Sequence, residues 1–64
     1  MEGYQERVVQ EKQDLYGKVE RLNGFIEDSP VFKTLPQDEQ LLLVRQLKHM
    51  RGYLVVLGDR IALF

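Results

Sequence analysis

The chain has 64 residues, of which 44% are hydrophobic and 30% charged, with no cysteine and a net charge of −1. This length excludes barrels and immunoglobulin sandwiches, which need about 100 residues or more. The lack of cysteine excludes disulfides and thiolate zinc sites, and the near-neutral charge argues against a general nucleic-acid-binding protein. Because a core of this size rarely supplies more than about 3–5 kcal/mol, we expect the chain to associate with further copies of itself.

Residues 3–28 are predicted to form one helix. Apolar side chains recur there at steps of three, four or seven residues, which keeps them on one stripe of a helix. They are Tyr4, Val8, Leu15, Val19, Leu22 and Ile26. Glycine disfavours a helix interior, so a break at Asn23-Gly24 is the alternative to an unbroken helix.

Residues 29–35 are predicted to connect two helices. Ser29-Pro30 is a favourable start for a short helical turn, since serine caps a helix and proline suits its first position. Phe32 is expected to close the end of the core. The alternative is that the connector is an exposed docking loop.

Residues 36–64 are predicted to form the second helix. Thr34 with Gln37 fits a capping box, and Asp38 and Glu39 suit the positive end of the helix dipole. Apolar residues then recur at alternating steps of four and three, which is an unbroken heptad seam. The seam consists of Leu43, Leu47, Met50, Leu54, Leu57, Ile61 and Phe64. We predict that this seam is the interface of an oligomer.

Further apolar residues lie on both sides of the seam. The tyrosine flank consists of Leu42, His49, Tyr53, Val56 and Leu63. The valine flank consists of Leu41, Val44, Val55 and Ala62. One partner helix covers one stripe only, and large exposed apolar patches usually mark interfaces. The sequence therefore predicts an all-α fold, a two-helix antiparallel hairpin with a short connecting turn that self-associates into a helical bundle, as a dimer or larger.

Charge supports the pairing of the two helices. Residues 1–28 carry a net charge of −3 and residues 29–64 a net charge of +2. Opposite charges favour an antiparallel contact, either within one chain or between two chains. Gly52 and Gly58 interrupt the second helix; they either permit a close helix approach or are simply tolerated.

No catalytic motif is present, and we expect a protein that is not an enzyme and that holds no cofactor or metal. The five glycines are scattered, so there is no phosphate-binding loop. Ser29, the only serine, has no histidine beside it in the sequence to activate it. His49, the only histidine, is expected to be an interface residue, because a metal would need ligands from a second chain.

One basic cluster stands out in the second helix. Arg45, Lys48 and Arg51 recur every three residues on one side. They form either a solvated face that pairs with the acidic first helix, or an anion or nucleotide site. In the second case Tyr53 and Tyr4 would offer surfaces on which a base could stack.

Short motifs along the chain resemble a family of small, largely uncharacterised helical proteins of tailed phages and prophages, also found in crAss-like phages. The similar segments are Tyr4-Gln5-Glu6-Arg7-Val8-Val9 with Glu11-Lys12, Arg21-Leu22-Asn23-Gly24-Phe25-Ile26, Leu35-Pro36 with Glu39-Gln40, and Met50, Tyr53, Leu57-Gly58 and Arg60-Ile61. Gly17 and Val55-Val56 depart from the pattern of the family. The family has no catalytic residues to carry over.

The resemblance implies a phage accessory protein that is made in the host bacterial cytoplasm and antagonises an antiviral defence. Such proteins bind a host defence protein or sequester a nucleotide signal, and the abundant apolar surface slightly favours a protein target. A structural or assembly component of the phage particle is the alternative. The polar, acidic start of the chain does not resemble a signal peptide, and no apolar run approaches the about 20 residues of a membrane span.

Overall fold

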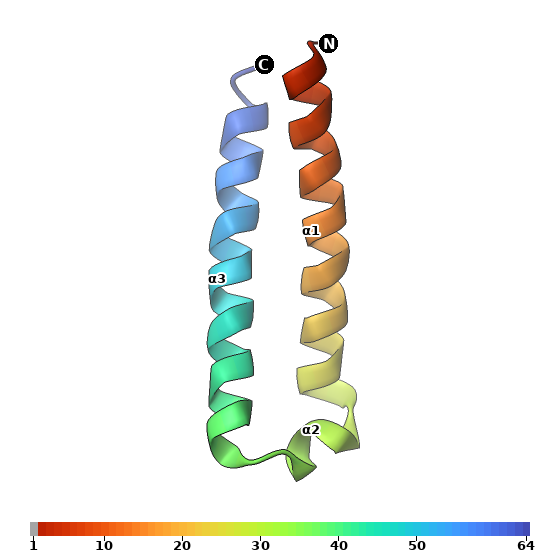
Figure 1. Cartoon of the computed structure of the whole chain (residues 1–64), viewed down its shortest axis with the longest axis vertical. Coiled ribbons are helices and arrows are strands. Elements are labelled where there is room, and N and C mark those ends of the chain that lie inside the picture. Colours follow the sequence, from red (N-terminus) through yellow and green to blue (C-terminus); the bar gives the residue numbers. More distant parts are fainter. Residues whose placement is uncertain (1) are drawn as a thin grey trace.

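The computed structural model describes residues 2–64, which form a hairpin of two long helices joined by a short one. Helix α1 spans Gly3–Asp28, α2 spans Pro30–Thr34 and α3 spans Gln37–Ile61. The hairpin is narrow and elongated, with extents of 46 × 15 × 13 Å. Helices α1 and α3 lie side by side and antiparallel, and α2 closes the end opposite the two termini (Figure 1). The predicted helical hairpin is confirmed.

Helix α1 is continuous, as its apolar stripe predicts. It passes through Gly24 without interruption, so the alternative break at Asn23-Gly24 does not occur. At its start the side chain of Gln5 accepts a hydrogen bond of 2.9 Å from the backbone N–H of Glu2. This contact satisfies one of the backbone donors that a helix N-terminus leaves unpaired.

The connector contains the short helix α2. The Ser29 hydroxyl oxygen accepts a hydrogen bond of 3.2 Å from the backbone N–H of Val31, and Pro30 occupies the first helical position. Phe32 is buried and meets Phe25 of α1 edge to face, with ring centroids 5.9 Å apart. The connector therefore closes the end of the core through Phe32, as predicted, while Val31 beside it is exposed.

The start of α3 differs from the prediction, because the capping box of Thr34 and Gln37 does not form. The Thr34 hydroxyl instead donates to the backbone carbonyl of Val31 at 2.7 Å, within α2. The Gln40 amide reaches back and donates to the carbonyl of Leu35 at 2.8 Å. Gln40, in the first turn of α3, thus pairs a backbone carbonyl of the connector. The sequence had predicted instead that Thr34 would cap α3.

The end of α3 also differs, since the helix stops at Ile61 and not at the last residue. The N–H groups of Leu63 and Phe64 bond the carbonyls of Arg60 and Ile61, three residues back, at 3.1 and 3.0 Å. Bonds over three residues tighten the last turn, as is common at helix ends. Phe64 therefore lies outside the helix, where its ring meets that of Tyr4 edge to face at 5.9 Å.

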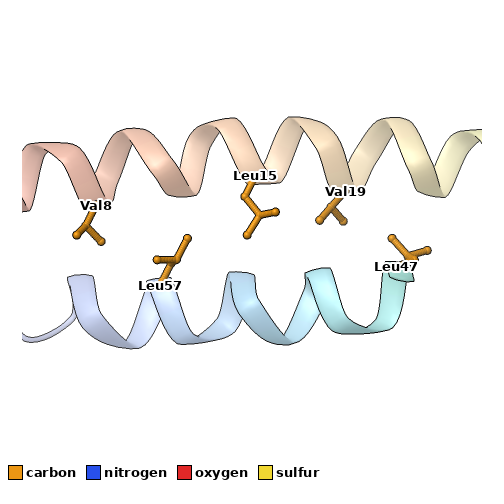
Figure 2. Packing of buried hydrophobic residues seen from close by; sticks show 5 residues of the cluster. All are labelled: Val8, Leu15, Val19, Leu47 and Leu57. Carbon is orange, nitrogen blue, oxygen red and sulfur yellow. The ribbon is translucent and has the colours of Figure 1, made fainter. Parts of the chain in front are cut away.

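The core is a single row of side chains between α1 and α3. Its buried members point toward one another from the two helices (Figure 2). They are Val8, Leu15 and Val19 from α1 and Leu47 and Leu57 from α3. Leu22, Ile26, Met50, Leu54 and Ile61 are partly buried against them.

The structure thus places most of the seam predicted as an oligomer interface against α1 of the same chain. Leu47, Met50, Leu54, Leu57 and Ile61 belong to the core cluster, Leu43 is half-buried, and Phe64 is exposed. Self-association remains a prediction. The two flanks are the apolar surfaces that the hairpin leaves exposed for self-association.

Leu57→Ala should lower the free energy of unfolding by about 2–5 kcal/mol, since it removes a fully buried side chain and leaves a cavity. Leu57 is 1% exposed, whereas Leu41 is 64% exposed on the same helix. Leu41→Ala is the matched control and should change stability by less than about 0.5 kcal/mol in the monomer. Chemical unfolding followed by circular dichroism measures both. Equal effects of the two substitutions would contradict this core.

Leu54→Asp should unfold the hairpin, because it places a carboxylate in the row of apolar side chains between α1 and α3. The expected result is a loss of most helical signal in circular dichroism, at every protein concentration. If the variant keeps its helicity, Leu54 does not belong to the intrachain core.

Candidate functional site

The outer surface of α3 carries two separate apolar strips. On the valine flank Leu41, Val44 and Val55 are exposed. On the tyrosine flank Leu42, Tyr53, Val56 and Leu63 are exposed. An isolated hairpin therefore leaves both flanks in contact with water, as the sequence predicted for a helix with one partner.

A groove of about 420 Å³ lies where α1 meets the C-terminal end of α3. It is lined by Val9, Lys12, Gln13 and Tyr16 of α1 and Ile61 of α3. Tyr16 is 55% exposed. The groove combines an aromatic ring, an ammonium group and apolar side chains, and this combination suits a planar molecule with negative charge.

This groove was not predicted from the sequence. Val9 and Tyr16 lie off the apolar stripe of α1 that packs on α3, and only the fold brings Ile61 to them. The available signal was their spacing of seven residues, which puts both on one line along the helix. Lys12, four residues before Tyr16, then falls beside that line.

The predicted basic residues Arg45, Lys48 and Arg51 are all exposed on α3. Arg51 reaches α1, where its Nη2 donates a hydrogen bond of 2.9 Å to Oδ1 of Asn23. The partner is a neutral amide, so this contact leaves the positive charge of Arg51 uncompensated. The basic cluster is therefore tied to α1 at one point and remains a candidate site for an anion.

Tyr53 lies on the other side of α3 from Lys48 and Arg51, two of the three cations with which it was grouped. Lys48 and Tyr53 are five residues apart, which puts them about 140° apart around the helix axis. One small ligand on a single chain does not touch both. Within one hairpin, the aromatic ring on the side of Lys48 and Arg51 is that of Tyr16.

The groove and two of the predicted cations share one side of the hairpin. Asn23, which binds Arg51, follows Tyr16 by seven residues and so lies on the same line of α1. Lys12 crosses toward α3 at Gly58, where an added Cβ would come within 3.8 Å of its Nζ. We call this surface the cationic side. It consists of Val9, Lys12, Gln13, Tyr16 and Asn23 of α1 and of Lys48, Arg51 and the valine flank of α3.

The structure also bears on His49, on metal binding and on membrane spans. His49 is exposed beside Tyr53 on the tyrosine flank, away from the core. Within residues 2–64, no group of three or more histidine, cysteine, aspartate or glutamate side chains is placed to hold a metal ion. None of the helices in the described part of the chain is long and apolar enough to cross a membrane.

Comparison with known proteins assigns the chain to a family. No curated protein and no solved structure matches the chain. A family model described as Sequestin matches residues 2–63, which include α1, α2 and α3 in full. A match over nearly the whole chain assigns the family, and the chain belongs to the Sequestin family.

Proposed function

We propose that this protein is a non-enzymatic phage accessory protein that sequesters a nucleotide signal of a host antiviral defence in the bacterial cytoplasm. Sequestration lowers the free concentration of a signal by reversible binding, so it requires affinity and no reacting group. The family name supports a sequestering role. The signal would be held between the cationic sides of two copies of the chain.

The observation that carries this proposal is the composition of the cationic side. The exposed Tyr16 ring stands in a groove with Lys12, and Lys48 and Arg51 lie farther along the same side. Nucleotides present planar bases and negative phosphates. Aromatic rings stack on bases, and lysine and arginine bind phosphate oxygens. The apolar flanks alone favour a protein target; the groove and the family name together favour a nucleotide.

The energetics indicate why two copies are needed. Stacking of one base contributes about 1–3 kcal/mol, and a hydrogen bond to a charged group about 1.5–3 kcal/mol. A Kd of about 1 µM requires about −8.2 kcal/mol, after a cost of about 4 kcal/mol or more for lost ligand freedom. One ring and two or three cations on an open surface fall short of this. A second cationic side doubles the contacts and covers the ligand.

Calorimetric titration of the full chain with a cyclic dinucleotide and with a cyclic trinucleotide tests the proposal. We expect at least one of them to bind with a Kd below about 1 µM, with one ligand per two chains. Lys12→Gln should weaken that binding at least about tenfold, which is about 1.4 kcal/mol, because it removes the ammonium group in the groove. Circular dichroism verifies that the variant keeps its fold.

Lys33→Gln is the matched control, since it removes the same charge from an exposed lysine of α2, outside the groove. It should bind like the unmodified chain. The proposal is overturned if neither nucleotide binds, or if Lys33→Gln weakens binding as much as Lys12→Gln does. In the second case the effect belongs to net charge and not to the groove.

The exposed flanks favour a second candidate function, occlusion of a host defence protein. Apolar contacts would carry that binding, so it would survive both Lys12→Gln and high salt. A host protein retained under these conditions, with no heat from either nucleotide, would support this function over sequestration. Abundant protein in purified virions would instead support a structural role in the particle.

A further inference from the structure

The two glycines inside α3 have different surroundings. Glycine disfavours a helix interior, because it loses more backbone freedom on folding than any other residue. A Cβ added at Gly52, which is exposed, would meet nothing within 4 Å. A Cβ added at Gly58 would meet the end of the Lys12 side chain, with Cε at 3.9 Å and Nζ at 3.8 Å. A larger side chain would therefore find open space at Gly52, whereas at Gly58 it would compete with Lys12.

Lys12 is more covered than the other lysines of the chain. It is half-buried, whereas Lys18, Lys33 and Lys48 are exposed. An exposed lysine keeps many rotamers, and a covered one has lost part of that freedom. Because both Cε and Nζ of Lys12 lie near Gly58, the end of the side chain lies along the surface of α3 and does not extend into solvent.

The last turn of α3 is a favourable place for an ammonium group. Helix α3 ends at Ile61, three residues after Gly58. The last carbonyl groups of a helix give its C-terminal end a partial negative charge, which attracts cations within the final turn. The absence of a side chain at Gly58 and the charge of the helix end therefore act together to hold the ammonium group of Lys12.

Gly58 borders the groove that Lys12, Tyr16 and Ile61 line. Residues three or four apart on a helix are neighbours on its surface, so Gly58 is next to Ile61 on α3 and Lys12 is next to Tyr16 on α1. Helical side chains lean toward the N-terminus of their helix, which directs Tyr16 toward the turn of Lys12. An ammonium group held at Gly58 therefore stays at the edge of the groove.

We propose that Gly58 is a positioning residue of the groove, which holds the ammonium group of Lys12 across α3 because position 58 has no side chain. Lys12 is then in place before a ligand arrives, so binding costs less side-chain freedom. The role in binding rests on the proposed function, whereas the contact between Gly58 and Lys12 needs no ligand. Of the two glycines in α3, Gly58 thus permits a close approach, of a side chain and not of a helix, and Gly52 is tolerated.

The contact is tested first on the full chain without ligand, by nuclear Overhauser effects in NMR. Gly58→Ala adds a methyl group at an ordinary van der Waals distance from Lys12, so the fold and Lys12 should stay in place. We expect a cross-peak between this methyl group and the ε-protons of Lys12. Gly52→Ala is the matched control, and its methyl group should show no cross-peak to α1. The inference is overturned if Gly58→Ala keeps its helicity and gives no cross-peak to Lys12.

Calorimetric titration with the cyclic dinucleotide and the cyclic trinucleotide tests the role in binding. Gly58→Leu puts a branched side chain where Lys12 ends, so it should weaken binding about tenfold. Gly58→Ala should bind like the unmodified chain. Gly52→Leu is the matched control, because it adds the same side chain to α3 in open space, and it should leave binding unchanged. Equal losses from Gly52→Leu and Gly58→Leu would overturn the inference.

A double-mutant cycle distinguishes positioning of Lys12 from a general disturbance of the groove. If Gly58 acts through Lys12, the combination of Gly58→Leu with Lys12→Gln should bind as Lys12→Gln alone does. Losses that add would show that Gly58→Leu acts by another route, and would overturn the inference. Circular dichroism verifies that each variant keeps its helices.

These outcomes are separable from those of the proposed function. If neither nucleotide binds, sequestration is overturned, and the cross-peak of Gly58→Ala still supports the contact with Lys12 by its presence or overturns it by its absence. If a nucleotide binds and Lys12→Gln weakens that binding, but the cross-peak is missing, sequestration stands and the inference about Gly58 is overturned.

Discussion

The single apolar row between α1 and α3 is the contact on which the rest of the structure depends. Each long helix has only one neighbour along its length, so each buries one stripe and exposes the remainder. Leu57 at 1% exposure and Leu41 at 64% lie on the same helix, less than five turns apart. In larger folds a third layer would cover such a helix on a second side. Here solvent, a ligand or another copy must do so.

The sequence predicted the fold well because the core obeys one rule, the heptad. Steps of four and three from Leu43 to Ile61 indicated which face of α3 is apolar, and the structure buries that face. The pattern does not say which chain supplies the partner helix. Because the connector is short and closed by Phe32 and Ser29, α1 of the same chain is near enough to occupy the seam first.

The details that sequence did not predict depend on three-dimensional proximity. Thr34 had the right spacing for a cap on α3, but its hydroxyl donates to the nearer carbonyl of Val31. The Gln40 amide instead donates to the carbonyl of Leu35 in the connector. Tyr16 was not singled out from the sequence, because the groove that contains it is completed by Ile61, which is remote in sequence. Tyr53 was grouped with Lys48 by distance along the chain, while rotation about the helix axis separates them.

The distribution of charge divides the surface of α3 into two kinds of apolar strip. The tyrosine flank has charges of both signs, with Arg45 and Asp59 at its edge and Arg60 on the line of Leu42. The valine flank has Lys48 and Arg51, of one sign, so its pairing with a copy of itself is opposed until an anion neutralises them. A contact between two valine flanks is therefore dominated by charge, which is screened within about 8 Å at physiological ionic strength. A ligand that joins two copies on the valine flanks would therefore have to be an anion, because Lys48 and Arg51 keep two such flanks apart without one.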